Sequence, residues 1–127
     1  MVLAKDREEE LIIKKDEDVR EEYLEEEGVE NVLRRILIGP EDGSQNIIMR
    51  YFKVLPQGNT PFHSHDFEHI VKMEKGKGLV VNNAGEETVI TEGQSLYIGS
   101  NEGHQFKNPF QQTLEFICTI PNPEKER

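Results

Sequence analysis

Short apolar runs separated by turn-forming residues fill the chain from residue 32 onward. Gly, Pro, Asn and Asp bound these runs, and no segment of 31–127 repeats with a helical period. Such a pattern is typical of antiparallel strands joined by tight turns. Turns are predicted at 40–43, 82–85 and 92–93. The predicted strands cover about 32–38, 46–55, 63–65, 69–74, 77–82, 86–91, 95–98, 104–107 and 113–120.

The pattern predicts an all-β fold, either a closed barrel or a two-sheet jelly roll. Both architectures bury one face of each strand and protect the strand edges. The first thirty residues lack this pattern and are rich in glutamate. We therefore divide the chain into an N-terminal extension, 1–30, and a barrel domain, 31–127.

Within the extension, the apolar run 11–13 predicts a short edge strand. Asp16 or Asp18 can cap a short helix that continues to about Glu27, with Gly28 as its terminator. The glutamates of this helix would face water. A partner-binding acidic tail is the alternative interpretation of the same segment.

The formal net charge of the 127 residues is −10, and most of it lies in the extension. Residues 1–30 hold 13 Asp and Glu against 5 Lys and Arg, whereas 31–127 hold 12 against 10. A negative chain without a basic stripe argues against nucleic-acid binding. The chain also lacks a membrane-length apolar run and a secretory leader pattern. Cys118 is the only cysteine, so an internal disulfide is excluded and a cytoplasmic location is expected.

All four histidines of the chain are candidate ligands of one metal ion. Three of them lie within seven residues, as His63, His65 and His69, and the fourth is His104. In an extended segment, residues two apart point to the same face, and His69 follows His65 at an even step. Imidazole suits Zn, Cu, Fe and Ni. An accidental surface cluster is the alternative to a metal site.

The spacing of these histidines resembles the two motifs of the cupins. His63-x-His65-x3-His69-x6-Gly76, with Gly58 upstream, is similar to the first motif, although His69 replaces the usual glutamate. The second motif is matched by Gly93, His104 and Asn108, with Gly99 and Asn101 replacing a proline and a glycine.

The resemblance covers roughly residues 31–120 and implies a jelly-roll barrel, the cupin double-stranded β-helix. It is strongest to small single-domain bacterial cupins with a four-histidine manganese site. It therefore implies one divalent ion per chain, held by His63, His65, His69 and His104. Manganese is the first expectation, and Fe, Zn, Ni and Cu stay open. Strand exchange among cupins implies a homodimer in which residues 11–14 pair with a second copy.

Alternation along the strands predicts the wall of a pocket beside the metal. Most of the side chains in this predicted wall are apolar and could equally be core residues. Cys118 is expected to be a small buried hydrophobe rather than a nucleophile. Arg50 is either an anion anchor or a surface residue. Asp66 and Glu68 have the wrong parity to point inward with His69. The candidate pocket residues are Arg50, Val71, Met73, Phe106, Phe116 and Cys118.

The resemblance implies a metal-dependent enzyme, of the oxidoreductase or dioxygenase type, acting on a small oxygen-bearing organic molecule. Two alternatives stay open: a non-redox isomerase or lyase that uses the ion as a Lewis acid, and a non-catalytic cupin that binds a metal and a small ligand. An interaction protein that works through its acidic 1–30 segment is a third possibility.

Overall fold

The computed structural model describes residues 11–125, which form nine strands and two 3₁₀ turns. All strand pairs are antiparallel. The 3₁₀ turns are η1 (Asp16–Asp18) and η2 (Pro40–Asp42). The strands are β1 (Glu22–Tyr23), β2 (Glu30–Ile38), β3 (Ile47–Asn59), β4 (His69–Lys75), β5 (Lys77–Val81), β6 (Glu87–Thr91), β7 (Ser95–Ile98), β8 (Gln105–Lys107) and β9 (Leu114–Pro121).

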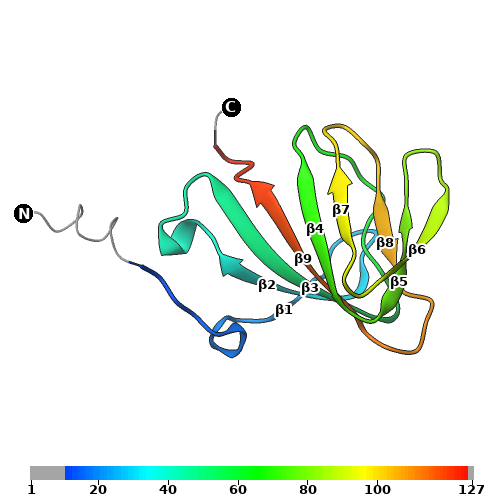
Figure 1. Cartoon of the computed structure of the whole chain (residues 1–127), viewed down its shortest axis with the longest axis horizontal. Coiled ribbons are helices and arrows are strands. Elements are labelled where there is room, and N and C mark those ends of the chain that lie inside the picture. Colours follow the sequence, from blue (N-terminus) through cyan, green and yellow to red (C-terminus); the bar gives the residue numbers. More distant parts are fainter. Residues whose placement is uncertain (1–10, 126–127) are drawn as a thin grey trace, which may run out of the picture.

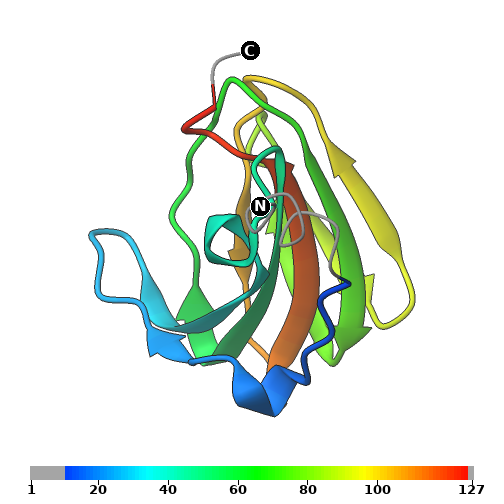
Figure 2. The same cartoon turned by 90° about the vertical axis from the view of Figure 1, so that its left-hand side faces the viewer.

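The strands form one curled sheet with the order β6-β5-β8-β3-β9-β4-β7, and β2 and β1 extend it beyond β3 (Figure 1). The long strand β3 organises this arrangement, because it pairs with β2 on one side, with β9 on the other, and with β8 at its end. The view turned by 90° shows the sheet curling around its interior (Figure 2). The prediction of an all-β jelly roll is confirmed.

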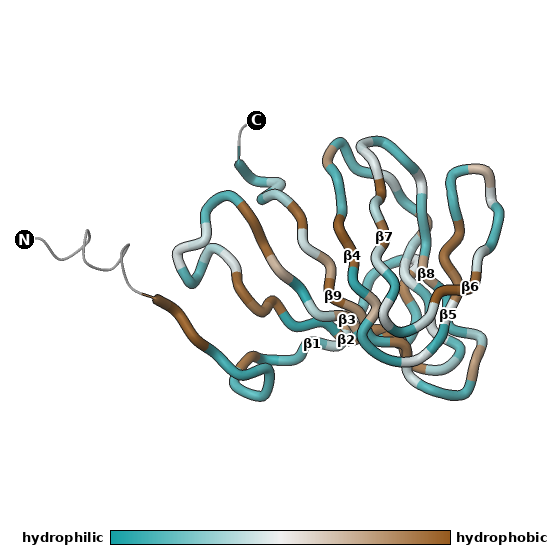
Figure 3. Tube along the Cα trace, in the orientation of Figure 1, coloured by the Kyte–Doolittle hydropathy of each residue, from teal (hydrophilic) through white to brown (hydrophobic). Residues whose placement is uncertain are grey.

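The core lies on the inner face of the curled sheet, where alternate residues of each strand are buried. In β9 the even positions from Leu114 to Ile120 are buried and the odd positions are partly exposed. In β4, Val71 and Met73 are buried beside them. Phe116 is only 1% exposed and stacks on both Phe52 and Phe106. Figure 3 shows hydrophobic residues along β4 and β9.

The prediction for the N-terminal extension is wrong in its secondary structure. Residues 11–15 form no strand, and the segment predicted as a helix contains β1. Tertiary contacts outweigh the capping signals here: Arg34 of β2 donates to the Glu22 carboxylate at 3.0 Å, and the Leu24 backbone N–H donates to the Val32 carbonyl. Leu24 also packs on the core. Residues 1–10 of the extension lie outside the described residues.

The predicted strand at 63–65 is also absent as a strand. His63 instead forms an isolated bridge with His104, in which each backbone N–H donates to the other residue's carbonyl, at 3.1 and 2.9 Å. The bridge ties the two histidine-bearing segments together. Among residues 11–125 no helix is long and apolar enough to cross a membrane.

Candidate functional site

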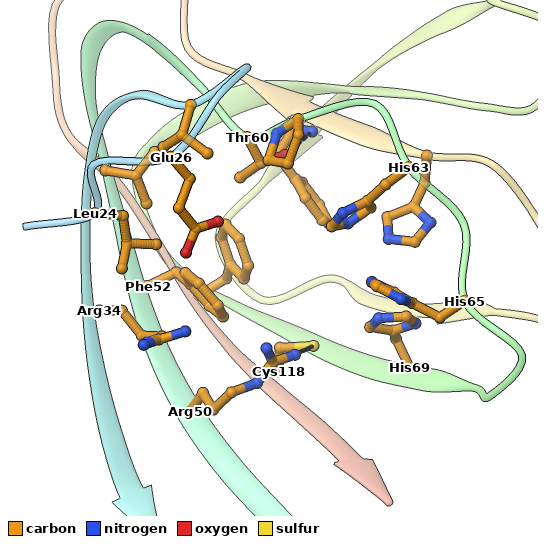
Figure 4. A pocket seen from close by; sticks show the side chains of 16 residues that line it. Leu24, Glu26, Arg34, Arg50, Phe52, Thr60, His63, His65, His69 and Cys118 are labelled. Atoms are coloured by element: carbon orange, nitrogen blue, oxygen red, sulfur yellow. Dashed lines mark hydrogen bonds between the residues drawn. The ribbon is translucent and has the colours of Figure 1, made fainter. Parts of the chain in front are cut away.

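A cavity of about 230 Å³ opens inside the curled sheet. Figure 4 shows the imidazoles of His63, His65 and His69 on one side of it and Arg34 and Phe52 on the other, with Arg50 reaching to Cys118. The lining residues are Leu24, Glu26, Val29, Val32, Arg34, Arg50, Phe52, Thr60, Pro61, His63, His65, His69, His104, Phe106, Phe116 and Cys118.

The four imidazoles come from three places in the fold. His63 and His65 lie in the segment before β4, His69 begins β4, and His104 directly precedes β8. Ring centroids are 4.4 Å apart for His63 and His65, 4.8 Å for His63 and His104, and 4.7 Å for His69 and His104. The structure therefore brings together all four histidines that the spacing singled out.

Each of these imidazoles is held in its neutral form. Burial lowers the pKa of His63 to about 4 and that of His69 to about 3, and neighbouring imidazoles and Arg50 add to both shifts. Burial likewise lowers the pKa of His65 and of His104. Neutral imidazole is the form that binds a metal ion, so no proton has to leave at pH 7.

Hydrogen bonding fixes which nitrogen the His104 ring can offer. The Nδ1 atom of His104 lies 2.9 Å from the Glu102 carbonyl oxygen, which can only accept, so Nδ1 carries the proton and Nε2 is free to bind. The Nδ1 atom of His69 is buried and has no hydrogen-bond partner among the described residues. An orphaned buried nitrogen is costly, and a ligand would relieve that cost.

The rings are neighbours, but their present orientations do not complete a metal site. Among residues 11–125 no group of three or more His, Cys, Asp or Glu side chains is arranged to hold a metal ion. The donor set nevertheless fits a divalent ion in chemistry, because the imidazoles are close and neutral, and one has an unused buried nitrogen.

The guanidinium of Arg50 faces the cavity from β3. Its Nη2 atom lies 3.1 Å from Cys118 Sγ, and its Cζ atom lies 4.9 Å from the centre of the Phe52 ring. Burial raises the pKa of the Cys118 thiol, and Arg50 opposes this shift only in part. Cys118 is therefore a neutral, buried thiol at pH 7 rather than an activated nucleophile.

Of the candidate pocket residues, four line the cavity and two do not. Arg50, Phe106, Phe116 and Cys118 are lining residues. Val71 and Met73 share the inner face of β4 with His69 but lie in the core away from the cavity. Asp66 and Glu68 are exposed, as parity predicts. The Glu68 carboxylate accepts a hydrogen bond from the Tyr97 hydroxyl.

Sequence reasoning missed Arg34 and Glu26 as lining residues. Arg34 has the parity of the buried Val32, and this signal could have placed it inside. Glu26 gave no usable signal, because its segment was interpreted as a helix. The cavity therefore draws residues from the N-terminal segment as well as from the barrel strands.

Two asparagines explain how the second histidine motif folds. Asn101 stands where the cupin motif has a glycine, and its φ of 66° is one that asparagine tolerates better than most residues. Asn108 is buried, and its side-chain amide donates to the carbonyls of Val54, at 2.8 Å, and Gln112, at 2.7 Å. Asn108 thus anchors the end of β8 to β3.

Comparison with known proteins identifies the family. The Cupin_2 family model, described as a cupin domain, matches residues 50–120. This match covers more than half of the chain, so the protein belongs to the cupin-domain family. The matched range contains all four histidines, His63, His65, His69 and His104.

Solved cupin structures have the same fold. The polyketide cyclase RemF from Streptomyces resistomycificus superposes with a TM-score of 0.84 at 28% identity, over 88% of this chain and 80% of that one. A cupin-2 domain from Rhodospirillum rubrum gives 0.76 at 24%, over 91% and 77%. A predicted oxalate decarboxylase from Thermotoga maritima gives 0.78 at 21%, over 87% and 98%.

A curated relative is similar over part of its length. The HTH-type transcriptional activator RhaS of Escherichia fergusonii is 39% identical over 73 residues, which are 58% of this chain. The chain spans about a quarter, 26%, of that relative. The likeness therefore concerns one segment of the activator.

Proposed function

We propose that this cupin is a metal-dependent enzyme, of the oxidoreductase or dioxygenase type, that acts on a small oxygen-bearing organic molecule. The observation that carries the proposal is the set of four neutral imidazoles at one end of a small cavity. His63, His65, His69 and His104 would hold one divalent ion, with manganese as the first expectation and Fe, Zn, Ni and Cu as alternatives. When bound, such an ion supplies Lewis acidity toward substrate oxygens and, if it is redox-active, electron transfer with dioxygen.

The protein's own residues set the conditions for this chemistry. Phe52, Phe106 and Phe116 line the cavity and exclude water from its apolar part. The Glu102 carbonyl holds His104 in one tautomer. The cavity volume of about 230 Å³ exceeds the roughly 150 Å³ of a cavity known to hold benzene, so a molecule the size of one ring fits.

Two alternative functions have support from specific relatives. The likeness to a polyketide cyclase at 28% identity supports, as one alternative, an isomerase or lyase reaction at the same imidazoles. The likeness to a segment of a transcriptional activator favours a non-catalytic ligand-binding cupin. We further propose a homodimer; a monomeric mass in solution would contradict this.

Metal content of the as-purified, never-chelated protein tests the central proposal. We expect about one ion per chain in the parent and a large loss in His69→Ala, because one of four ligands is removed. Ser64→Ala is the matched control, since Ser64 is exposed in the same segment. Metal-free protein that takes up no ion on reconstitution would overturn the proposal, as would equal metal content in His69→Ala.

Oxygen dependence separates the proposed enzyme from its alternatives. Candidate substrates would be incubated with the metal-loaded protein in air and under argon. Turnover that requires oxygen supports the dioxygenase type, and equal turnover under argon supports the isomerase or lyase type. Binding without turnover in either gas supports the ligand-binding cupin.

A further inference from the structure

Two arginines, Arg34 and Arg50, lie on neighbouring strands and face the cavity. Arg34 of β2 is the register partner of Phe52 of β3, and Arg50 lies two residues before Phe52 on the same strand. Both side chains line the cavity (Figure 4). Their strands are paired directly, so both guanidinium groups are held by rigid sheet rather than by a loop.

The hydrogen-bonding capacity of these guanidinium groups is largely unused. The guanidinium of Arg50 donates to the Cys118 thiol, and sulfur is a weak acceptor for a charged donor. The Nε atoms of Arg34 and Arg50 are buried and have no hydrogen-bond partner among residues 11–125. A guanidinium carries five donors, and a buried charged donor without an acceptor is costly. An acceptor bound in the cavity would relieve this cost at Arg50 and Arg34, which line it.

The charge balance of the cavity points to an anion. The Glu22 carboxylate accepts a hydrogen bond from Arg34 Nη2 at 3.0 Å and offsets that charge. Within the described residues Arg50 has no ion pair, so its positive charge is uncompensated at close range. Glu26 is the lining carboxylate, but it is exposed and forms no ion pair with either arginine within that same part of the chain.

We propose that Arg50, assisted by Arg34, forms a carboxylate-binding subsite, and that the ligand of this cavity is a small organic carboxylate. A guanidinium fork matches the planar carboxylate and binds it through two hydrogen bonds. The apolar body of the ligand would lie on Phe52 and Phe116, toward the imidazoles. A single uncompensated positive charge and apolar walls fit an organic monocarboxylate better than a divalent phosphate.

This inference names the substrate class of the proposed enzyme. It rests on the proposed function in one respect, that the bound molecule is called a substrate. Anion binding itself does not depend on a metal ion. It can therefore be measured on the full-length protein both as purified and after dialysis against EDTA. Failure of metal uptake and failure of carboxylate binding are then separate results.

The test is a titration of the protein with acetate, propionate and benzoate, each compared with its neutral amide. Binding is measured by calorimetry or by NMR chemical-shift changes. We expect at least one acid to bind more tightly than its amide and Arg50→Gln to weaken that binding by about tenfold or more, the size of a lost charge-assisted hydrogen bond. Arg35→Gln is the matched control, because Arg35 is the next residue to Arg34 on β2, carries the same charge and does not line the cavity.

Glu26→Gln sharpens the test, because it has the opposite predicted sign. Removing the lining carboxylate should tighten binding of the same acid several-fold without touching Arg50. Equal binding of acid and amide would overturn the proposal. An equal loss of carboxylate affinity in Arg35→Gln and Arg50→Gln would also overturn it. Carboxylate binding that disappears when metal is removed with EDTA, but persists in Arg50→Gln, would overturn it as well. Inorganic phosphate binding more tightly than every carboxylate would overturn the carboxylate assignment.

Discussion

The two nitrogen-rich parts of the cavity respond to burial in different ways. At the imidazole end, burial lowers the pKa values, and the four histidines become neutral. At the arginine end, Arg34 and Arg50 cannot lose their protons, because a guanidinium stays charged in proteins. The same partly apolar cavity therefore holds a neutral set of metal-type donors and a permanent positive charge, and Arg50 lies close enough to contribute to the lowered pKa of all four imidazoles. This difference suits a molecule with an oxygen-bearing group for the first end and an anionic group for the second.

The largest effect is expected where the two parts share a wall. Phe116 stacks on Phe52, near the arginines, with ring centroids 5.3 Å apart, and on Phe106, next to the imidazole end, at 4.5 Å. Phe116→Ala should lower the free energy of unfolding by about 3–5 kcal/mol, because it leaves a cavity in a well-packed core. Urea denaturation measures the change. A loss below about 1 kcal/mol would show that the two parts do not depend on this ring.

Alternation predicted the barrel side of this cavity well. In β9 alternation predicts Phe116 and Cys118 as pocket residues, and both are buried, together with Leu114 and Ile120. In β3 the parity that buries Phe52 and Val54 also places Arg50 at the cavity. Period-two patterns succeed here because one face of each strand is buried, so a shift by one residue would expose the whole apolar set.

The remaining parts of the cavity depend on contacts that a local pattern does not contain. In β2 a register shift between Ile36 and Ile38 changes which parity is buried, so Val32 and Leu37 are both buried. In the extension, the Glu21 carboxylate forms an ion pair with Lys53, with Nζ and Oε2 3.0 Å apart. Such long-range pairing favours an extended chain and overrides the helix signals.

The second prediction concerns the imidazole end in metal-free protein. The folded pKa values of His63, about 4, and His69, about 3, lie below the ordinary value of 6.5. Between pH 6.5 and these values the unfolded chain binds more protons, so the free energy of unfolding falls as pH falls. From pH 7 to 5 we expect a loss on the order of 1 kcal/mol for each buried imidazole.

Urea denaturation in EDTA at pH 7 and pH 5 measures this loss. His69→Gln should show a smaller loss between the two pH values than the parent, because one titrating group is gone. The chosen range lies above the titration of ordinary carboxyl groups, which keeps their contribution small. A free energy of unfolding that is the same at both pH values would contradict neutral burial of the histidines.

The third prediction tests the opposite behaviour of the arginine end. Arg50→Met replaces an uncompensated, partly buried cation with an apolar side chain of similar length, and should leave the ligand-free protein equally stable or more stable by about 1 kcal/mol. Arg35→Met, in which the altered residue does not line the cavity, is the control and should not stabilise. Destabilisation by more than about 2 kcal/mol in Arg50→Met alone would mean that this charge has a strong partner in the folded chain.

The smallest effect is expected at Glu22, whose carboxylate compensates Arg34. Hydrogen bonds from Arg34 and Arg20 lower the pKa of Glu22, but the pair is solvent-accessible, with side-chain exposures of 26% for Arg34 and 29% for Glu22. Glu22→Gln should therefore cost less than about 1 kcal/mol of stability, and less still in high salt. The same change leaves Arg34 with an uncompensated charge. If Arg34 assists Arg50, carboxylate binding should then tighten while stability hardly changes, whereas unchanged binding would restrict the anion subsite to Arg50.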